Sequence, residues 1–333
     1  MLDTGRGLSF AKPYSFLALR SWRDALFDSY FEASKAQSLG IDYPRNLLVL
    51  GTTEQNTRPG ASVEQLLESM AIPGDAYEVV DENPIKFQTA YLTDTTRPVP
   101  GGLRYEIATN GGGSYITDCT VNSASALYIP AYGYYVRGWL VASHCVSPQM
   151  SMQSDYIYQA SWPSNMIGVE FSDPPGWSCG NHGSYQCRYS DAAWIWPLSQ
   201  SDTDQGSIAR TLSWTGSTVI DPVYPRFYVT GSFAPSVGTV VEKVGWVSGW
   251  TTGTVNNTCH DFIGSGTNKL MVCQVEAQLH SVGGDSGAPV FYWPATASDV
   301  DYLGILSGGD GTHAEFSPLS SIGSELGGIY ALH

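Results

Sequence analysis

Residues 283–289 read GGDSGAP, with Ser286 at the centre of the segment. A serine hydroxyl is a weak nucleophile until a neighbouring base takes its proton and backbone N–H groups stand ready to hold an oxyanion. Because glycine reaches backbone conformations that other residues avoid, a tight turn here can direct the N–H groups of Gly284 and Ser286 into one space. The segment therefore indicates a nucleophilic serine, although an ordinary glycine-rich turn would share the pattern.

Two segments upstream offer partners for this serine. Residues 141–145 read VASHC, a short apolar strand that ends in His144 next to a cysteine. Residues 189–196 read YSDAAWIW, in which Asp191 directly precedes an apolar strand. A buried carboxylate can hold an imidazole in the tautomer that accepts a proton and can stabilise its cation. Taken singly, His144 could instead be a structural histidine, and Asp191 could cap a turn.

From about residue 101 to residue 309 the sequence predicts β-strands. Short runs of strand-forming residues are bounded by clusters of Gly, Pro, Asn and Ser, for example at residues 103–108, 139–142, 240–247 and 270–277. Regular alternation of strands and turns without helices favours barrels or sandwiches over a parallel βαβ sheet. Near the C-terminus, Ile322 and Leu326 lie at helical spacing, which predicts a short helix at residues 318–326.

The first 80 or so residues have a different pattern, which predicts a small α/β unit. Apolar residues recur at steps of three and four from residue 14 to about residue 39, as expected for an amphipathic helix. A strand at residues 46–51, a helix at 62–70 and an extended stretch at 76–80 follow. Ser62 and Gln65 can form a capping box at the start of the second helix. Residues 81–100, which contain three prolines, predict a linker or arm.

The composition excludes several classes of protein. With 42% hydrophobic and 14% charged residues, the chain of 333 residues lacks the signature of disorder and can bury a large core. A formal net charge of -15 would repel nucleic acids and anionic membrane surfaces, so neither is an expected partner. No segment approaches the roughly 20 apolar residues that a membrane-spanning helix needs.

The six cysteines lie in three close pairs: Cys119 and Cys145, Cys179 and Cys187, Cys259 and Cys273. An even number favours disulfides and an oxidising compartment, and pairs that close short loops are favoured among the 15 pairings that six cysteines allow. No Cys-x-x-Cys pair points to a metal, so we expect neither a metal nor a cofactor. We expect a secreted protein, although Met1 is not followed by the charged and then apolar residues of a secretion signal.

Together, His144, Asp191 and Ser286 resemble the catalytic triad of chymotrypsin-like serine proteases, which have the same order along the chain. The similarity extends from about residue 96 to the C-terminus and is to bacterial members related to streptogrisins and α-lytic protease. Further matching stretches are RPVPGGL at 97–103, VEKVGWVSGWTTGTV at 241–255, GILSGG at 304–309 and FSPLSSI at 316–322.

The resemblance implies a mainly β fold with two antiparallel barrels, at about residues 101–205 and 206–333, and a short C-terminal helix. These barrels would form a protease domain at residues 91–333, after an N-terminal α/β region at residues 1–90. The region before Tyr91 resembles, more weakly, the pro-region of such bacterial proteases. It could equally be a retained accessory domain.

The resemblance also implies roles for residues around the triad. The N–H groups of Gly284 and Ser286 would form the oxyanion hole, and the pair Cys119 and Cys145 would fix the loop that carries His144. The edge formed by Ser307, Gly308 and Gly309 would pair with the substrate backbone.

His280 would lie at the floor of the specificity pocket, with Ser281 beside it and Gly309 opposite. A histidine cannot neutralise a buried cation, which predicts poor cleavage after Arg and Lys and a preference for apolar or uncharged side chains. His280 or His313 could accept an acidic side chain, and Asp310 or Glu315 could instead supply a negative charge.

Two departures from the family pattern stand out. Relatives usually carry Lys-x-Gly-Arg-Thr-Thr-Gly where residues 243–249 read KVGWVSG, which puts the local hydrogen bonds in doubt. Many relatives have Gly-Gly-Pro after the serine, whereas here Gly287 is followed by Ala288. The second change adds only a methyl group and leaves the nucleophile and oxyanion positions intact.

We therefore expect a secreted, monomeric serine endopeptidase, a hydrolase that acts on peptide or protein substrates. One alternative is a catalytically silent binding protein with a protease fold, and another is a zymogen held inactive by its N-terminal region. An esterase is a further alternative, but the nucleophile elbow of α/β-hydrolases lies between a strand and a helix, whereas Ser286 lies among predicted strands.

Overall fold

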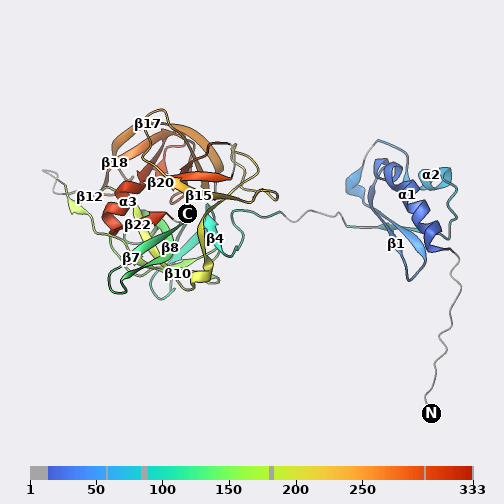
Figure 1. Ribbon diagram of the computed structural model, residues 1–333, viewed down its shortest axis with the longest axis horizontal. Helices are drawn as coiled ribbons and strands as arrows, with labels where there is room; N and C mark the ends of the chain where they lie inside the picture. Colours follow the sequence, from blue (N-terminus) through green and yellow to red (C-terminus); the bar gives the residue numbers. More distant parts are fainter. Residues whose placement is uncertain (1–13, 58, 84–88, 180–183, 296–297, 332–333) are drawn as a thin grey trace, which may run out of the picture. The chain divides into compact units, whose positions relative to one another are not determined.

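The computed structural model describes residues 14–57, 59–83, 89–179, 184–295 and 298–331. The chain divides into two compact units, residues 1–88 and residues 89–333. Figure 1 shows one layer of helix on a small sheet in the first unit and two large sheets in the second. No helix among the described residues is long and apolar enough to cross a membrane.

The first unit packs two helices against a three-stranded sheet. Its elements are α1 (Phe16–Glu32), β1 (Ala36–Asp42), β2 (Leu47–Thr52), the short 3-10 helix η1 (Glu54–Asn56), α2 (Val63–Ser69) and β3 (Tyr77–Asp81). Strand β2 is central, antiparallel to β1 and parallel to β3, and α2 lies in the connection between the two parallel strands. Leu19 and Leu26 of α1 pack with Leu48 and Leu50 of β2 in one buried cluster.

The first helix is shorter than the sequence predicts. Ser15 caps its start by accepting the N–H of Ala18, and the helix ends at Glu32 rather than near residue 39. Ala33 is already extended, with φ -73° and ψ 152°, and Lys35 has a φ of 68°, which a helix cannot continue. The following residues then pair with β2. By contrast, the capping box expected at the start of α2 is present.

The second unit contains an antiparallel sheet of eight strands in the order β22-β7-β8-β13-β10-β9-β5-β6. The strands are β5 (Arg104–Ala108), β6 (Tyr115–Thr120), β7 (Ala124–Ile129), β8 (Tyr134–Ala142), β9 (Tyr156–Tyr158), β10 (Met166–Ser172), β13 (Ala192–Pro197) and β22 (Ile329–Ala331). Strand β22 closes one end of this sheet although it comes last in the chain. Short 3-10 helices η2 (Ser143–Cys145) and η3 (Gln200–Asp202) follow β8 and β13.

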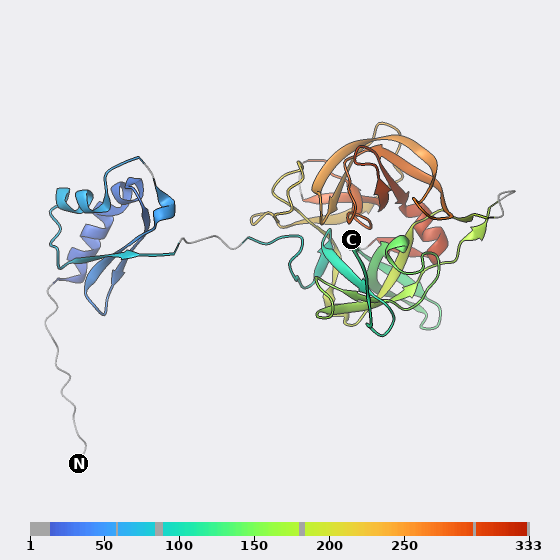
Figure 2. The same ribbon diagram turned by 180° about the vertical axis from the view of Figure 1, so that it is seen from behind.

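The other sheet of this unit has eleven strands, in the order β11-β12-β18-β17-β16-β19-β20-β15-β14-β4, with β21 paired to β18 and β20. The strands are β4 (Val99–Gly101), β11 (Trp177–Ser178), β12 (Gln186–Arg188), β14 (Thr203–Ala209), β15 (Arg226–Ser232), β16 (Val240–Gly245), β17 (Gly249–Ile263), β18 (Lys269–Gln278), β19 (Pro289–Tyr292), β20 (Asp299–Gly309) and β21 (Ala314–Pro318). Helix α3 (Leu319–Leu326) follows β21 and precedes β22. Figure 2 shows this unit from behind.

The predicted fold class is confirmed: the chain is mainly β, with two large sheets, a short C-terminal helix and a small α/β region before them. One buried cluster takes Trp139 and Trp194 from the eight-stranded sheet and Phe227, Trp250 and Phe291 from the other, so the two sheets share a core. Part of the expected linker, residues 84–88, lies outside the described residues. The end of that segment forms β4, a strand of the larger sheet.

Candidate active site

A cleft of about 900 Å³ in the second unit is lined by His144, Asp191 and Ser286. One wall comes from β6 and the segment after β8, and the other comes from β17, β18 and the ends of β20 and β21. The structure therefore brings together three residues that are far apart in the sequence.

Neighbouring strands place His144 beside Asp191. Ala142, the last residue of β8, pairs with Ala192, the first residue of β13, so the segments just beyond both strands meet. Nδ1 of His144 lies 2.5 Å from Oδ2 of Asp191, and Oδ1 of Asp191 accepts the backbone N–H of His144 at 3.0 Å. The Asp191 side chain is 2% exposed and that of His144 is 34% exposed. The imidazole therefore stands between a buried carboxylate and the open cleft.

This contact determines the charges of the pair. Burial alone would lower the pKa of His144, but the charge and the hydrogen bond of Asp191 outweigh it, and the pKa lies above the ordinary value of 6.5. Burial would raise the pKa of Asp191, but the charge and hydrogen bonds of His144 and the charge of Arg188 outweigh it, and that pKa is lowered. An ionised Asp191 accepts the proton on Nδ1 of His144, which leaves Nε2 as the proton acceptor.

The turn that carries Ser286 requires its glycines. Gly284 has a φ of 97°, and a Cβ there would lie 2.5 Å from Cγ2 of Val247. Gly287 has a φ of 89°, and a Cβ there would lie 2.3 Å from the Thr120 carbonyl oxygen. Thr120 also donates its hydroxyl to the Gly284 carbonyl and its N–H to the Ser286 carbonyl, at 2.9 and 2.8 Å. These contacts fix the peptide groups on either side of Asp285.

The N–H groups of Gly284 and Ser286 have no acceptor among the described residues. Both residues line the cleft, so the two N–H groups are available to an oxyanion. The Ser286 hydroxyl donates a long hydrogen bond of 3.5 Å to the Ser307 carbonyl and, within the described ranges, none to His144. Such bonds are often long without substrate and tighten when it binds.

A buried ion pair supports the same turn. Oδ2 of Asp285 lies 3.0 Å from Nζ of Lys243, and Oδ1 accepts the N–H groups of Val247 and Ser248. The sequence left the local hydrogen bonds of residues 243–249 in doubt, and the structure shows three of them, from Lys243, Val247 and Ser248 to Asp285. Sequence reasoning gave Lys243 no role. The available signal was a lysine between the apolar residues Val241 and Val244 of a predicted strand.

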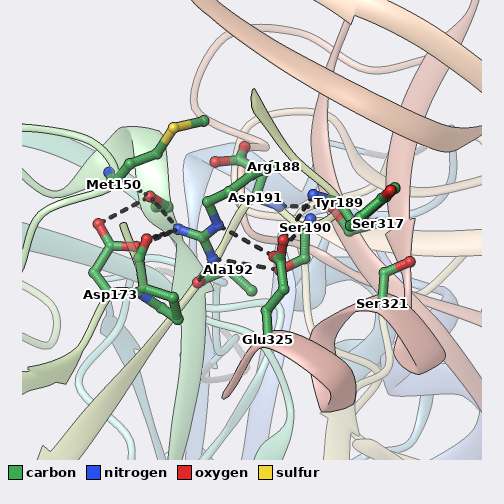
Figure 3. A network of polar contacts seen from close by, with 12 residues as sticks. Met150, Asp173, Arg188, Tyr189, Ser190, Asp191, Ala192, Ser317, Ser321 and Glu325 are labelled. Carbon is green, nitrogen blue, oxygen red and sulfur yellow. Dashed lines mark hydrogen bonds and ion pairs between the residues drawn. The ribbon is translucent and has the colours of Figure 1, made fainter. Parts of the chain in front are cut away.

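Arg188 is a second buried cation behind the site, with a side chain only 1% exposed. Figure 3 shows its guanidinium group between Asp173 and Glu325. Nη1 lies 2.6 Å from Asp173, Nε lies 3.2 Å from Glu325, and Nη2 donates to the Ala192 carbonyl at 2.6 Å. Glu325, on α3, also accepts the N–H of Ser190 at 2.9 Å. Both neighbours of Asp191 in the chain are therefore tied to this network.

The network extends to the neighbour of His144. The Ser143 hydroxyl donates to Asp173 at 2.9 Å, and Asp173 in turn binds Arg188. On the other side, Asp191 donates its N–H to Oγ of Ser317 at 2.8 Å. Sequence reasoning gave these residues no role, although Ser143 and Ser317 lie within the quoted stretches 141–145 and 316–322, because their partners are 15 to 126 residues away in the chain.

One strand edge in the cleft is open beside Ser286. Strand β21 pairs with one edge of β20 as far as Gly309, the last residue of β20. Strand β19 pairs with the opposite edge only as far as Ile305. Ser307, Gly308 and Gly309 line the cleft, as expected, and in the described chain no strand pairs with their second edge. The structure thus offers an edge to which an extended peptide can add.

The residues expected at the floor of a specificity pocket lie directly behind the cleft lining. His280 donates its Nδ1 proton to the Gly311 carbonyl at 2.6 Å. Oγ of Ser281 lies 2.4 Å from where a Cβ at Gly309 would be, and Gly309 lines the cleft. Titratable side chains from β17, β18, β21 and the connection between β20 and β21 line the cleft: His260, Glu276, Asp310, His313 and Glu315. Sequence reasoning named the last three and missed the first two.

The three expected disulfides are present: Cys119–Cys145, Cys179–Cys187 and Cys259–Cys273. Cys145 directly follows His144, so the first bond connects the histidine segment to the end of β6. The other two bonds lie in the larger sheet, at β12 and between β17 and β18.

A scan against models of protein families gives no match, and a search of curated proteins gives no significant one. Among solved structures, the chain is similar to a Nocardiopsis protease at 19% identity and a TM-score of 0.48, over 71% of this chain and 99% of that one. It is similar to Thermobifida fusca protease A at 20% identity and to a Cellulomonas bogoriensis chymotrypsin at 19%, each with a TM-score of 0.47, over 70% of this chain and 98% of theirs. The similarity to bacterial proteases that the sequence predicts is present, and at this level it says nothing of activity.

Proposed function

We propose that the protein is a serine endopeptidase that hydrolyses peptide bonds through an acyl-enzyme intermediate. One observation carries the proposal. A single cleft holds a serine whose turn leaves two N–H groups free, together with a histidine that is hydrogen-bonded to a buried aspartate. These are the components that acyl transfer by serine requires.

In the proposed reaction, Oγ of Ser286 attacks the peptide carbonyl carbon while Nε2 of His144 takes the hydroxyl proton. The N–H groups of Gly284 and Ser286 hold the resulting oxyanion, and Asp191 stabilises the imidazolium. His144 then gives the proton to the leaving amine as the peptide C–N bond breaks. Water then attacks the carbonyl carbon of the ester while Nε2 of His144 takes a proton from it. His144 gives this proton to Oγ of Ser286 as the ester C–O bond breaks, which releases the acid product and the free serine.

The open edge at residues 307–309 favours a peptide over other acyl substrates. Backbone hydrogen bonds to this edge would hold an extended chain beside Ser286, whereas a simple ester has no strand to add. We keep Ser307, Gly308 and Gly309 as substrate-binding residues. The contribution of His280 and Ser281 to side-chain preference stays a prediction.

The proposal is tested by cleavage of unstructured protein and peptide libraries. Ser286→Ala should reduce kcat by several powers of ten, because only binding and the oxyanion hole remain. Ser265→Ala is the control for loss of a serine hydroxyl from the same cleft, because Ser265 also lines it. Activity of the Ser286→Ala protein within tenfold of the parent would refute the assignment, and complete inactivity of the parent would favour a silent binding protein.

We also propose that residues 1–88 are a pro-region and that the protein is secreted. Three disulfides fit an oxidising compartment. A pro-region removed by the enzyme itself should be lost from the mature parent and retained in the Ser286→Ala protein, which N-terminal sequencing of both can decide. Retention in both active and inactive forms would favour an accessory domain.

A further inference from the structure

We propose that His260, Glu276 and Glu315 form a site for a divalent transition-metal cation of the zinc class, on one wall of the cleft. Each side chain offers one ligand atom, and the three atoms lie within 4.8 Å of one another. All three residues line the cleft, so an ion can reach them from solvent.

Three strands of the larger sheet hold these side chains in place. His260 lies on β17, Glu276 on β18 and Glu315 on β21, and β18 pairs with both of the other strands. Glu276 and Glu315 are direct partners in the ladder between β18 and β21. Side chains of directly paired residues lie on the same face of a sheet, so the two carboxylates are neighbours without any rearrangement of the backbone.

The contacts within the cluster leave part of it unsatisfied. Oε1 of Glu315 lies 2.6 Å from Nδ1 of His260. Oε2 of Glu315 is buried and has no hydrogen-bond partner among the described residues. A buried carboxylate oxygen without a partner is unfavourable, and like charges on directly paired residues are also unfavourable. An ion pair between His260 and Glu315 accounts for Oε1 alone, whereas a bound cation would satisfy Oε2 and neutralise Glu276 as well.

The ligand set favours zinc over calcium. Zinc binds both imidazole nitrogen and carboxylate oxygen, with bonds of about 2.0 to 2.2 Å. Small rotations of the side chains would bring the three atoms to that distance from one ion and leave a fourth position open to the cleft. Calcium prefers six to eight oxygen ligands, which this cluster does not supply. The nearby group Cys259, Asp261 and Cys273 is a poorer candidate, because its two cysteines form a disulfide and offer no thiolate.

The position of the cluster connects it to the proposed substrate edge. Glu315 pairs with Gly308 in the ladder between β21 and β20. A bound ion would therefore lie one strand away from the edge that we propose to hold the peptide, and it would alter KM for peptides. Only this consequence rests on the proposed function, because binding of the ion does not require the chain to be a protease.

The test is calorimetric titration of zinc chloride into the full chain carrying Ser286→Ala, in buffer free of chelators and thiols. We expect one ion per chain at this cluster, with binding weakened at least tenfold by Glu315→Gln, Glu276→Gln or His260→Ala, because each removes a ligand. His280→Ala and Glu68→Gln are the matched controls, one histidine and one exposed glutamate outside the cluster, and should bind zinc as the parent does.

Thermal unfolding provides a second measurement that does not depend on activity. Zinc at 100 times its Kd should raise the stability of the parent, and that rise should shrink in the three cluster variants. Absence of binding by the parent below millimolar zinc would overturn the proposal. Unchanged affinity in the cluster variants, or tighter binding of calcium chloride than of zinc chloride, would overturn it as well. If zinc binds as expected and the parent cleaves no peptide, the site stands and the proposed function fails.

Discussion

Nζ of Lys243 lies 3.0 Å from Oδ2 of Asp285, and neither side chain has any exposed surface. Asp285 directly precedes Ser286, while Lys243 lies on β16 and also donates to the Gly249 carbonyl at 3.1 Å. The pair therefore connects the turn that carries Ser286 to strand β16. Both members of this ion pair belong to the second unit, residues 89–333.

Lys243→Met should destabilise the protein strongly, because it leaves the Asp285 carboxylate buried without its cation. Removing one member of a buried ion pair typically costs about 3 to 5 kcal/mol in the free energy of unfolding. Denaturation by urea measures this loss, and the double variant Lys243→Met with Asp285→Asn should recover part of it. A loss below about 1 kcal/mol for the single variant would show that the pair does not support the turn.

Arg188→Lys tests whether the network of Figure 3 positions His144 and Asp191. Lysine keeps the positive charge but cannot contact Asp173, Glu325 and the Ala192 carbonyl at once, because it lacks the planar fork of arginine. We expect kcat to fall at least tenfold with KM nearly unchanged, since the substrate edge is not touched.

The control for this variant is Arg137→Lys, on β8, because Arg137 makes no ion pair within the described chain. A purely structural role for Arg188 would lower stability without changing kcat in the fraction that remains folded. Equal kcat in folded Arg188→Lys and parent protein would therefore contradict a positioning role.

The pH dependence of kcat/KM should report His144. A general base must be neutral, and the pKa of His144 is raised above 6.5 because Asp191 outweighs the effect of burial. We therefore expect kcat/KM to increase with pH through an apparent pKa above 6.5. Asp191→Asn removes the charge and the charged hydrogen bond that raise the pKa of His144, and it leaves the burial that lowers this pKa. We therefore expect the rise of kcat/KM to occur at lower pH in this variant, and kcat/KM to fall by about four powers of ten. If the apparent pKa of this rise is the same in Asp191→Asn and in the parent, a group other than His144 titrates.

Glu242 should make the free energy of unfolding decrease as the pH rises, whereas a carboxylate in an ion pair makes it increase. Burial raises its pKa to about 7 against the hydrogen bond from Trp250, whereas the ordinary value is 4.5. The folded protein therefore holds this proton more tightly, and the stability that results is present below pH 4.5 and lost as the pH rises through about 7.

Glu242→Gln removes the ionisation and keeps an acceptor for Trp250. We expect the free energy of unfolding of this variant, relative to the parent, to be roughly 1 to 3 kcal/mol higher at pH 8 than at pH 4.5. Glu68→Gln, at an exposed position on α2, should show no such difference. Parallel pH profiles for parent and Glu242→Gln would contradict the raised pKa.

The sequence predicted the elements that have a local signal. The capping box of Ser62 and Gln65, the strand at β16 and the helix at α3 all follow from spacings within a few residues. The end of α1 was wrong because apolar residues continue past Glu32, and pairing of β1 with β2 determines their conformation there. The final strand β22 was missed because its partner, β7, is about 200 residues earlier in the chain.

The supporting residues of the candidate site could not be predicted for the same physical reason. Lys243 and Asp285 are 42 residues apart, His260 and Glu315 are 55 apart, and Arg188 and Glu325 are 137 apart. Nothing near Arg188 in the sequence distinguishes a buried arginine from an exposed one. The three residues His144, Asp191 and Ser286 could be predicted because the glycines around Ser286 and the strand before His144 are local features of the sequence. The roles of the three residues stay predictions.

Reaction with a serine-directed fluorophosphonate, followed by peptide mass spectrometry, tests the proposed function most directly. The reagent forms a stable bond only with a hydroxyl that a nearby base activates, so it reports the nucleophile without assuming a substrate. We predict a single label on Ser286, formed at a rate that increases with pH as His144 loses its proton and abolished in His144→Ala. A label on another serine, or no label on Ser286 in the folded and disulfide-bonded protein, would contradict the proposal that this chain is a serine endopeptidase.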